Sequence, residues 1–318
     1  MRISVALCTY NGERFLQEQL DSLRRQTRPP DELVIVDDAS HDASVEVARR
    51  FADSTRLPVR LAVNPRNLGY AANFERAISR CTGDVVALCD QDDVWRDDKL
   101  ERIADVFATC DNIGMVFSDA LLVDAAGRPL PGRLWERVGF AAHERMRAEA
   151  GDLFRLLLRG TLVTGATMAF RARLRQFVLP ICPGWDHDAW IALLLSAVSE
   201  VRAIAEPLIR YRQHDDNQIG ARQVGMVERW QRMRRLGSTP QAERQRRYAL
   251  ALDRLRALTA VPPETTALLT AALEHVSARA CLPPTRRARL TPVLRELLRG
   301  RYALASFGVR SAVRDLLM

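Results

Sequence analysis

The most informative group of reactive side chains in this 318-residue chain is Asp90-Gln91-Asp92-Asp93. Carboxylates this close repel one another, and a hard divalent cation with oxygen ligands, Mg²⁺ or Mn²⁺, relieves that repulsion. Such a cation keeps coordination positions open for phosphate oxygens. Asp92 or Asp93 could instead cap a helix that begins near Asp97, but one aspartate would suffice for that. We therefore predict a metal site, with the choice of main ligand between Asp92 and Asp93 left open.

Two earlier turns also have polar residues directly after an apolar run. Asp37 and Asp38 follow such a run, where a carboxylate can accept a hydrogen bond from a ribose hydroxyl or a pyrimidine N–H, or can equally cap the next helix. Tyr10-Asn11-Gly12 precedes a predicted helix, where free backbone N–H groups favour an anion, although an ordinary turn explains the same residues. Neither turn has the glycine pattern of a dinucleotide site or a P-loop.

Two later groups could supply a base and a further ligand. Asp186-His187-Asp188 stands before the apolar run 191–198, where a partly desolvated carboxylate can act as a general base or can cap the helix. His214 ends a strand-like run, and a neutral imidazole can complete a mixed oxygen–nitrogen metal shell. On its own, a single histidine more often has a packing role.

The elements that position these residues follow from the hydrophobic periodicity. Apolar runs predict strands at 3–7, 33–36, 59–63, 85–89 and 115–117. Amphipathic helices are predicted between them. This alternation favours a mostly parallel α/β sheet, in which ligands bind at the carboxyl ends of the strands. Residues 120–150 predict an extended loop, 163–170 a strand, and 201–204 and 208–211 two short strands.

The C-terminal third differs in composition, and we predict a domain boundary near residue 220. Residues 219–318 contain 19 arginines and 7 acidic residues, a charge of 19 − 7 = +12 in a chain of net charge +8. We predict a basic helical region over 221–318. It could contact an anionic partner, and the basic amphipathic helix predicted at 226–235 suggests a membrane surface. Solvated arginine-rich helix faces explain the same pattern.

The cellular compartment is predicted from sequence features that the chain does not contain. No apolar run is long enough for a membrane-spanning helix, and the first residues form a strand pattern instead of a signal peptide. The six cysteines are scattered without a C-x-x-C pair, which predicts buried free thiols in a reducing compartment. We expect a cytoplasmic protein, with a peripheral position at the inner face of the membrane as an added feature.

Taken together, these motifs resemble family 2 glycosyltransferases, which have the GT-A fold, over residues 1–220. The resemblance implies an α/β, Rossmann-like domain with a mostly parallel sheet. It also implies an inverting hexosyltransferase with a dTDP- or UDP-sugar donor, a glycan or lipid-linked acceptor, and no nucleic acid partner. Implied donor contacts are Thr9, Tyr10, Asn11, Asp38, Asn67, Asn73, Asp90 and Gln91, and implied metal ligands are Asp92, Asp93 and His214.

The later segments are similar in particular to bacterial rhamnosyltransferase-like members, which suggests cell-surface polysaccharide assembly. His187-Asp188-Ala189-Trp190 resembles the segment that contains the catalytic base, and the base maps to Asp188. Many relatives have Glu where this chain has His187, which leaves Asp186 as an alternative base. The acceptor or sugar region is expected to include Gly165, Trp185, Asp186, His187 and Trp190.

Two other classes of function remain as alternatives. A sugar nucleotidyltransferase would also use an acidic metal site, but it usually has a Gly-rich first loop with Arg or Lys, which Thr9-Tyr10-Asn11-Gly12 lacks. A basic module that binds membrane or nucleic acid would use the C-terminal arginines.

Overall fold

The computed structural model describes residues 1–214, 238–258 and 261–317. The chain divides into two compact units, the first made of residues 1–151 and 162–221, the second of residues 152–161 and 222–318. The short segment 152–161 therefore belongs to the second unit, although the boundary predicted near residue 220 put it in the first.

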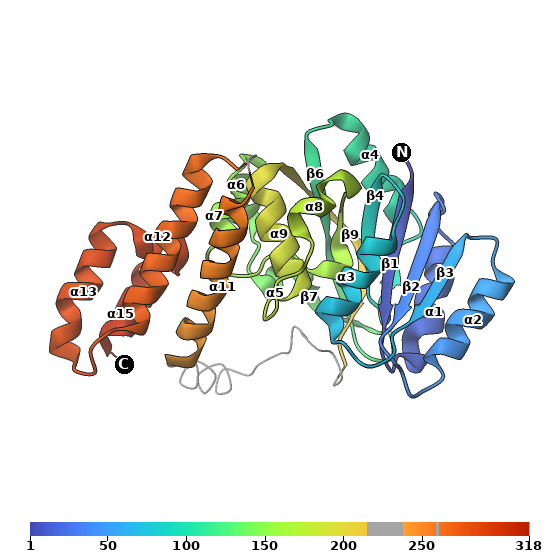
Figure 1. The fold of residues 1–318 in the computed structure, drawn as a ribbon, viewed down its shortest axis with the longest axis horizontal. Coiled ribbons are helices and arrows are strands. Elements are labelled where there is room, and N and C mark those ends of the chain that lie inside the picture. Colours follow the sequence, from blue (N-terminus) through green and yellow to red (C-terminus); the bar gives the residue numbers. More distant parts are fainter. Residues whose placement is uncertain (215–237, 259–260, 318) are drawn as a thin grey trace. The chain divides into compact units, whose positions relative to one another are not determined.

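The first unit begins with four parallel strands in the spatial order β3-β2-β1-β4 (Figure 1). They are β1 (Ile3–Thr9), β2 (Glu32–Asp37), β3 (Val59–Val63) and β4 (Val85–Cys89). Helices α1 (Glu13–Arg24), α2 (Ser44–Ser54) and α3 (Tyr70–Arg80) connect them. Every residue of β1, β2 and β4 is buried, as their near-continuous apolar runs predict. Because the strands are parallel, the turns that follow them lie at one edge of the sheet.

Five further strands extend the sheet beyond β4. They are β8 (Met168–Arg171), β6 (Ile113–Val123), β9 (Glu200–Arg212), β5 (Val94–Trp95) and β7 (Pro129–Arg133). Strand β8 is antiparallel to both β4 and β6, and β9 is parallel to β6. Strands β5 and β7 pair antiparallel with β9 and β6, so the whole sheet is mixed. The end of β9 thereby comes to the short strand β5, which directly follows the acidic turn.

The prediction of an extended loop at residues 120–150 was wrong. Strand β6 continues to Val123, and β7 is followed by helices α5 (Leu134–Val138) and α6 (Ala142–Glu149). Pro129 is compatible with β7 because this strand pairs only with β6 among the described strands, and proline is tolerated on such an edge.

Two strand predictions also needed correction. The strand predicted at 163–170 is confined to β8, and a 3-10 turn, η1 (Gly165–Thr167), precedes it. The two strands predicted at 201–204 and 208–211 form the single strand β9. Shifts in its register with β6 around Pro207 allow the pairing to continue past the proline.

The second unit is helical, as predicted. Its described helices are α7 (Leu153–Leu157), α11 (Ser238–Arg256), α12 (Pro263–Ala280), α13 (Arg286–Leu298), α14 (Arg301–Ala305) and α15 (Val309–Leu317). A buried polar network joins α12, α14 and α15. The Arg279 guanidinium donates to both carboxylate oxygens of Asp315, at 2.6 and 2.9 Å, and the Tyr302 hydroxyl donates to the same carboxylate at 2.7 Å.

The described residues include no helix that is both long enough and apolar enough to cross a bilayer. The basic helix predicted at 226–235 lies outside the described residues. All six cysteines are free. The predicted burial holds for Cys8, Cys81 and Cys89, whereas Cys281 is exposed at the end of α12.

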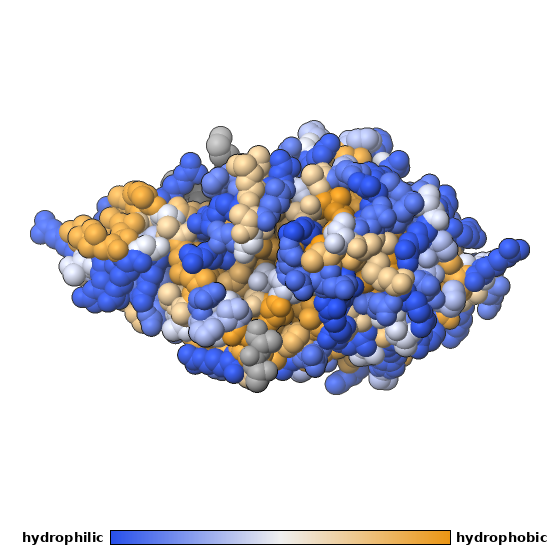
Figure 2. All heavy atoms as spheres, turned by 90° about the horizontal axis from the view of Figure 1, so that it is seen from above, coloured by the Kyte–Doolittle hydropathy of each residue, from blue (hydrophilic) through white to orange (hydrophobic). Residues whose placement is uncertain are grey.

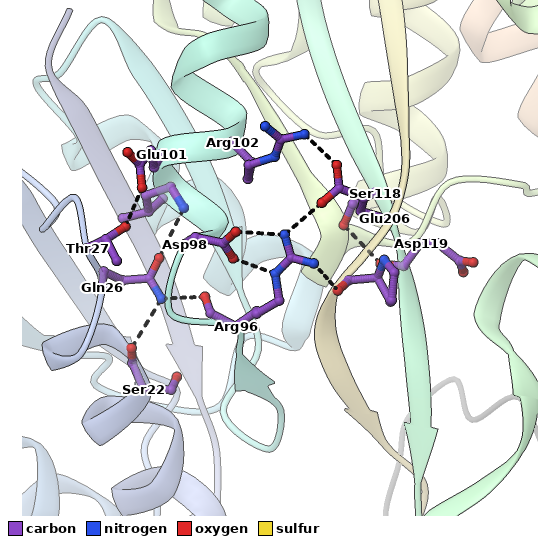
Figure 3. Close-up of polar contacts among 12 residues, drawn as sticks. Ser22, Gln26, Thr27, Arg96, Asp98, Glu101, Arg102, Ser118, Asp119 and Glu206 are labelled. Atoms are coloured by element: carbon purple, nitrogen blue, oxygen red, sulfur yellow. Dashed lines mark hydrogen bonds and ion pairs between the residues drawn. The ribbon is translucent and has the colours of Figure 1, made fainter.

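In the first unit, helix α4 (Lys99–Thr109) has no side-chain cap of its own at its start. Gln26, which follows α1, supplies the acceptor: its Oε1 atom accepts from the backbone N–H of Leu100 at 3.0 Å (Figure 3). The guanidinium of Arg96 pairs with Glu206 of β9 at 2.9 Å. The beginning of α4 is thus attached both to α1 and to β9.

Lys99, the only lysine in the chain, is fully buried at the first residue of α4. Its Nζ atom donates to the carbonyl oxygen of Ala166 in η1 at 2.7 Å and lies 3.5 Å from the centre of the Trp95 ring. Burial lowers the pKa of Lys99 to about 7, against weaker raising effects of Cys89 and neighbouring carboxylates. Lys99 therefore links α4 to η1 at a considerable desolvation cost.

We predict that Lys99→Met changes how stability depends on pH. The pKa of Lys99 is about 7 in the folded protein and near 10.5 when unfolded, so between these values the unfolded chain binds more protons. Stability of the wild type should then rise with pH, by at most about 1.4 kcal/mol per pH unit from this group. Urea unfolding at pH 7 and pH 9 should show this rise in the wild type relative to Lys99→Met.

The matched control is Arg50→Met, which removes an exposed cation from α2. Its stability should follow the same pH dependence as the wild type. Parallel pH profiles for the wild type and Lys99→Met would contradict the prediction.

Candidate active site

The acidic turn after β4 lies where the sheet edge is largely buried. Asp93 is 1% exposed, and burial raises its pKa well above the ordinary value, with Asp92 and Asp90 adding to the effect. Burial likewise raises the pKa of Asp90 to about 8, with further contributions from Asp92 and Asp188. The negative charge of Asp188 thus acts on Asp90, and a common site for the two residues stays a prediction.

The end of β9 holds the acidic turn in place. The backbone N–H of Arg212 donates to Asp93 Oδ1 at 3.0 Å, and its Nε atom donates to the carbonyl oxygen of Asp92 at 2.8 Å. Nε2 of His214 lies 2.8 Å from Asp92 Oδ2, and the His214 ring packs against Phe15 at 4.8 Å. The structure thus brings His214 to the acidic turn. Arg212 was not predicted, because nothing in the sequence distinguishes its guanidinium from 45 other arginines.

The chemistry of the acidic turn suits a divalent cation. Asp93 Oδ2 is buried and has no hydrogen-bond partner among the residues that the structure describes. Asp92 and His214 present a carboxylate and an imidazole beside it, a donor set that suits Mn²⁺ or Mg²⁺. In the described ranges no three such groups already converge around one point. The donor chemistry fits the cation, and ligation by these three side chains stays a prediction. Neither aspartate caps α4, whose N-cap residue is Asp98.

Gln91 joins the acidic turn to the first loop of the chain. Its Oε1 atom accepts from the Thr9 hydroxyl at 2.7 Å and from the Tyr10 N–H at 2.8 Å, and its Nε2 atom donates to the Tyr10 carbonyl at 3.1 Å. A Cβ atom at Gly12 would lie 2.1 Å from Gln91 Oε1, which explains the glycine. The sequence placed Gln91 among the donor contacts, and the structure shows it as the link between β1 and β4.

The turn after β1 also connects to the turn after β2. Asn11 adopts a left-handed backbone conformation, with φ of 47°, which asparagine tolerates better than most residues. Its N–H donates to Ser40 Oγ at 2.9 Å, and its Oδ1 atom accepts from the His41 N–H at 2.9 Å. The candidate donor residues of β1 and β2 therefore form one connected rim.

Asp38 is buried, and the chain itself provides partners for both of its carboxylate oxygens. Oδ1 accepts from Asn64 Nδ2 at 2.6 Å and from the Leu68 N–H at 2.9 Å, and Oδ2 accepts from the Gly69 N–H at 2.8 Å. Asp38 thus shapes the loop after β3. Contact between Asp38 and a nucleoside remains a prediction. Such a contact would have to use carboxylate lone pairs of Asp38 that these three hydrogen bonds leave available.

Asn67 and Asn73 belong to the same network. Asn67 Oδ1 accepts from the Gly69 N–H at 3.0 Å, and the buried Asn73 donates to the carbonyl of Val36 at 3.0 Å. Asn64, which the sequence predictions omitted, donates to Asn73 Oδ1 at 2.9 Å, and its own Oδ1 is buried without a partner in the described residues. Its position as the first polar residue after β3 was the available signal.

The segment before α9 (His187–Val198) contains the candidate bases. Asp188 Oδ2 accepts from the Gly165 N–H at 3.1 Å, which orients this carboxylate against η1. The Asp186 carboxylate instead accepts a hydrogen bond from the Tyr70 hydroxyl. Asp186 occupies the N-cap position without a side-chain capping bond, so the capping alternative is not supported for it.

The aromatic members of the expected acceptor region are packing residues. The His187 ring stacks on Phe74 with centres 3.9 Å apart, and burial lowers its pKa, which favours the neutral imidazole. Trp190 is buried and donates from Nε1 to the carbonyl of Val178 at 2.8 Å. Trp185 is also buried and packs on Trp190 at 5.5 Å. Contact of these rings with an acceptor stays a prediction.

Comparison with known proteins identifies the domain. Residues 4–147 match the family model described as glycosyl transferase family 2. An uncharacterized glycosyltransferase of Nostoc sp. is 28% identical over 228 residues, which span 68% of this chain and 66% of that protein. The uncharacterized glycosyltransferase YwdF of Bacillus subtilis is 25% identical over 246 residues, which span 76% of this chain and 87% of that protein.

Solved structures share the fold. TarS residues 1–349 of S. aureus, crystallised with UDP-GlcNAc, match with a TM-score of 0.55 and 18% identity, covering 96% of this chain and 88% of that one. The mannosyltransferase PcManGT of Pyrobaculum calidifontis, in complex with GDP-Man and Mn²⁺, matches with a TM-score of 0.52 and 20% identity, covering 95% and 75%. The predicted GT-A fold with a helical C-terminal region is confirmed, and the chain contains a glycosyltransferase family 2 domain over residues 4–147.

Proposed function

We propose that this glycosyltransferase moves a sugar from a nucleoside-diphosphate donor to a hydroxyl group of a glycan or lipid-linked acceptor, with inversion at the anomeric carbon. The observation that carries the proposal is the placement of Asp188 beside η1: the Gly165 N–H donates to Asp188 at 3.1 Å, and the adjacent Ala166 carbonyl accepts from Lys99, which follows the acidic turn, at 2.7 Å. The contribution of Asp188 to the raised pKa of Asp90 agrees with this placement. A base and a diphosphate site must face the same anomeric carbon for direct displacement. The complexes of TarS with UDP-GlcNAc and of PcManGT with GDP-Man support a nucleotide-sugar donor.

In this proposal Asp188 removes the proton of the acceptor hydroxyl. The oxygen of that hydroxyl forms a bond to the anomeric carbon as the bond to the diphosphate breaks, and the proton stays on the Asp188 carboxylate. The Gly165 N–H orients Asp188, and Lys99 holds η1 through Ala166. Asp186 is the weaker candidate, because the Tyr70 hydroxyl already donates to its carboxylate.

We also propose that Asp92, Asp93 and His214 hold Mn²⁺ or Mg²⁺. When bound, such a cation supplies positive charge that stabilises the departing diphosphate. The Mn²⁺ present with GDP-Man in the PcManGT structure supports this assignment. Thr9, Tyr10, Asn11, Asp38, Asn67, Asn73, Asp90 and Gln91 stay the proposed donor-binding residues, and Gly165, Trp185, Asp186, His187 and Trp190 the proposed acceptor region.

The donor sugar is proposed from resemblance alone, with rhamnose on dTDP or UDP as the first candidates in cell-surface polysaccharide assembly. A sugar nucleotidyltransferase is less well supported, because the first loop, Thr9-Tyr10-Asn11-Gly12, lacks the Gly-rich sequence with Arg or Lys that usually binds a triphosphate. Thermal stabilisation by UDP-GlcNAc, dTDP-rhamnose and GDP-mannose, each with Mn²⁺, would identify the donor. Uptake of a sugar 1-phosphate with release of pyrophosphate would favour the nucleotidyltransferase.

The base assignment predicts that Asp188→Asn lowers kcat by about 10²- to 10⁴-fold, because the amide cannot accept the proton. Binding of UDP, measured by calorimetry, should be unchanged. The measured kcat is the rate at which nucleoside diphosphate is released, determined with the donor that supports turnover by the wild type.

The control is Asp186→Asn, which changes the neighbouring carboxylate and its bond to Tyr70. It should retain most of the turnover. If Asp186→Asn loses activity while Asp188→Asn keeps it, the roles of the two residues are reversed.

The metal assignment predicts that Asp92→Asn and Asp93→Asn each weaken Mn²⁺ binding by at least about tenfold, since each removes a charged ligand. Electron paramagnetic resonance of free Mn²⁺ measures this without reference to activity. Chelation with EDTA should abolish diphosphate release, and Mn²⁺ should restore it.

Asp97→Asn is the matched control, because Asp97 is an exposed aspartate in the same loop. Its Mn²⁺ affinity should equal that of the wild type. Equal affinities for all three variants would refute the metal site.

A further inference from the structure

Two helices of the second unit expose apolar side chains in regular stripes. On α13 they are Leu290, Leu294 and Leu298, with exposed fractions of 58%, 56% and 80%, and on α15 they are Val309, Val313 and Leu317, with 68%, 47% and 59%. A spacing of four residues puts each stripe on one side of its helix. Phe307, 73% exposed, lies just before α15. We call these seven residues the apolar face, and Figure 2 shows hydrophobic surface on the part of the chain that carries these helices.

The apolar face is separate from the packing side of the same helices. Val293 of α13, Tyr302 of α14 and Ala312 of α15 form a buried cluster. The hydrogen bonds of Arg279 and Tyr302 to Asp315 fix α15 to α12 and α14. The unit therefore satisfies its own core and still presents large aliphatic and aromatic side chains to solvent, which marks an interaction surface.

The charges around this face have one sign. Residues 286–317 contain eight arginines and two acidic residues, a charge of 8 − 2 = +6. Both acids are buried: Glu296 is 4% exposed and pairs with Arg301, and Asp315 is 9% exposed and pairs with Arg279. The exposed charged side chains of this segment are all arginines, at positions 286, 287, 295, 299 and 310.

We propose that the apolar face and its surrounding arginines dock on an anionic lipid bilayer. Leu, Val and Phe side chains can enter the boundary between headgroups and acyl chains, while the flexible arginines reach the phosphate groups. A second copy of the chain fits this surface less well, because a symmetric contact would bring arginines of both copies together.

This surface differs from the membrane helix predicted at residues 226–235, which lies outside the described residues. The docking proposal rests on the proposed function and extends it, because transfer to a lipid-linked acceptor requires the enzyme to work at a membrane. Docking itself does not depend on catalysis, so lipid binding and donor turnover can be tested, and can fail, separately.

The experiment is co-sedimentation of the full chain with vesicles of phosphatidylcholine alone or of phosphatidylcholine with phosphatidylglycerol. The wild type should bind the anionic vesicles at least about tenfold more strongly, and added salt should weaken the binding. Leu294→Glu combined with Val313→Glu should reduce binding to anionic vesicles by a similar factor. So should Arg295→Gln combined with Arg310→Gln, which leaves the apolar face intact.

The control is Met146→Glu, a change at a residue of α6 that is 62% exposed and outside the face. It should bind anionic vesicles like the wild type. Thermal unfolding and UDP binding report whether each variant is folded. Should the glutamate variant unfold, the arginine variant and the salt dependence of the wild type still decide the question.

Three results would overturn the proposal. The wild type could fail to sediment with anionic vesicles, or the arginine variant could bind them as well as the wild type does. Light scattering could instead show a lipid-free dimer that the glutamate variant dissociates, with no vesicle binding, which would make the face a self-association surface.

Discussion

Burying several carboxyl groups in one turn costs free energy, because each group is desolvated and each repels the others. In this protein the cost appears as raised pKa values of Asp90 and Asp93. The surrounding structure offsets it with directed hydrogen bonds: the Arg212 backbone and guanidinium contact the turn, and His214 pairs with Asp92. A divalent cation held at the same turn would offset the remainder.

The elements around the acidic turn each connect it to another part of the proposed site. Gln91 ties the turn to Thr9 and Tyr10 on the first loop. Lys99, ten residues from Cys89 at the end of β4, reaches the carbonyl of Ala166, and the adjacent Gly165 N–H orients Asp188. A displacement of the turn would therefore shift both the donor loop and the proposed base, which suits a reaction limited by positioning.

The helical unit follows a different physical rule. Its buried charged groups are paired, as Arg279 is with Asp315, and on α13 and α15 exposed arginines lie among exposed aliphatic side chains. In our proposal the first unit concentrates negative charge to bind a cation, which would in turn attract the diphosphate, whereas the helical unit concentrates positive charge beside apolar surface. In our proposals one unit of the chain binds the nucleotide-sugar donor, and the other unit binds an anionic membrane surface.

By itself the sequence determined the parallel strands β1 to β4, the acidic turn, and the family, because apolar periodicity and short motifs are local properties of the chain. It failed at residues 120–150, where proline and glycine suggested a loop but β6, β7 and two helices form, and it divided β9 into two strands at Pro207, across which pairing with β6 continues. Only the tertiary structure decided that Arg212 and Lys99 support the site, that Asp38 holds the loop after β3, and that Trp190 packs in the core. These roles depend on contacts between residues far apart in the chain, such as Lys99 with Ala166, which no local pattern encodes.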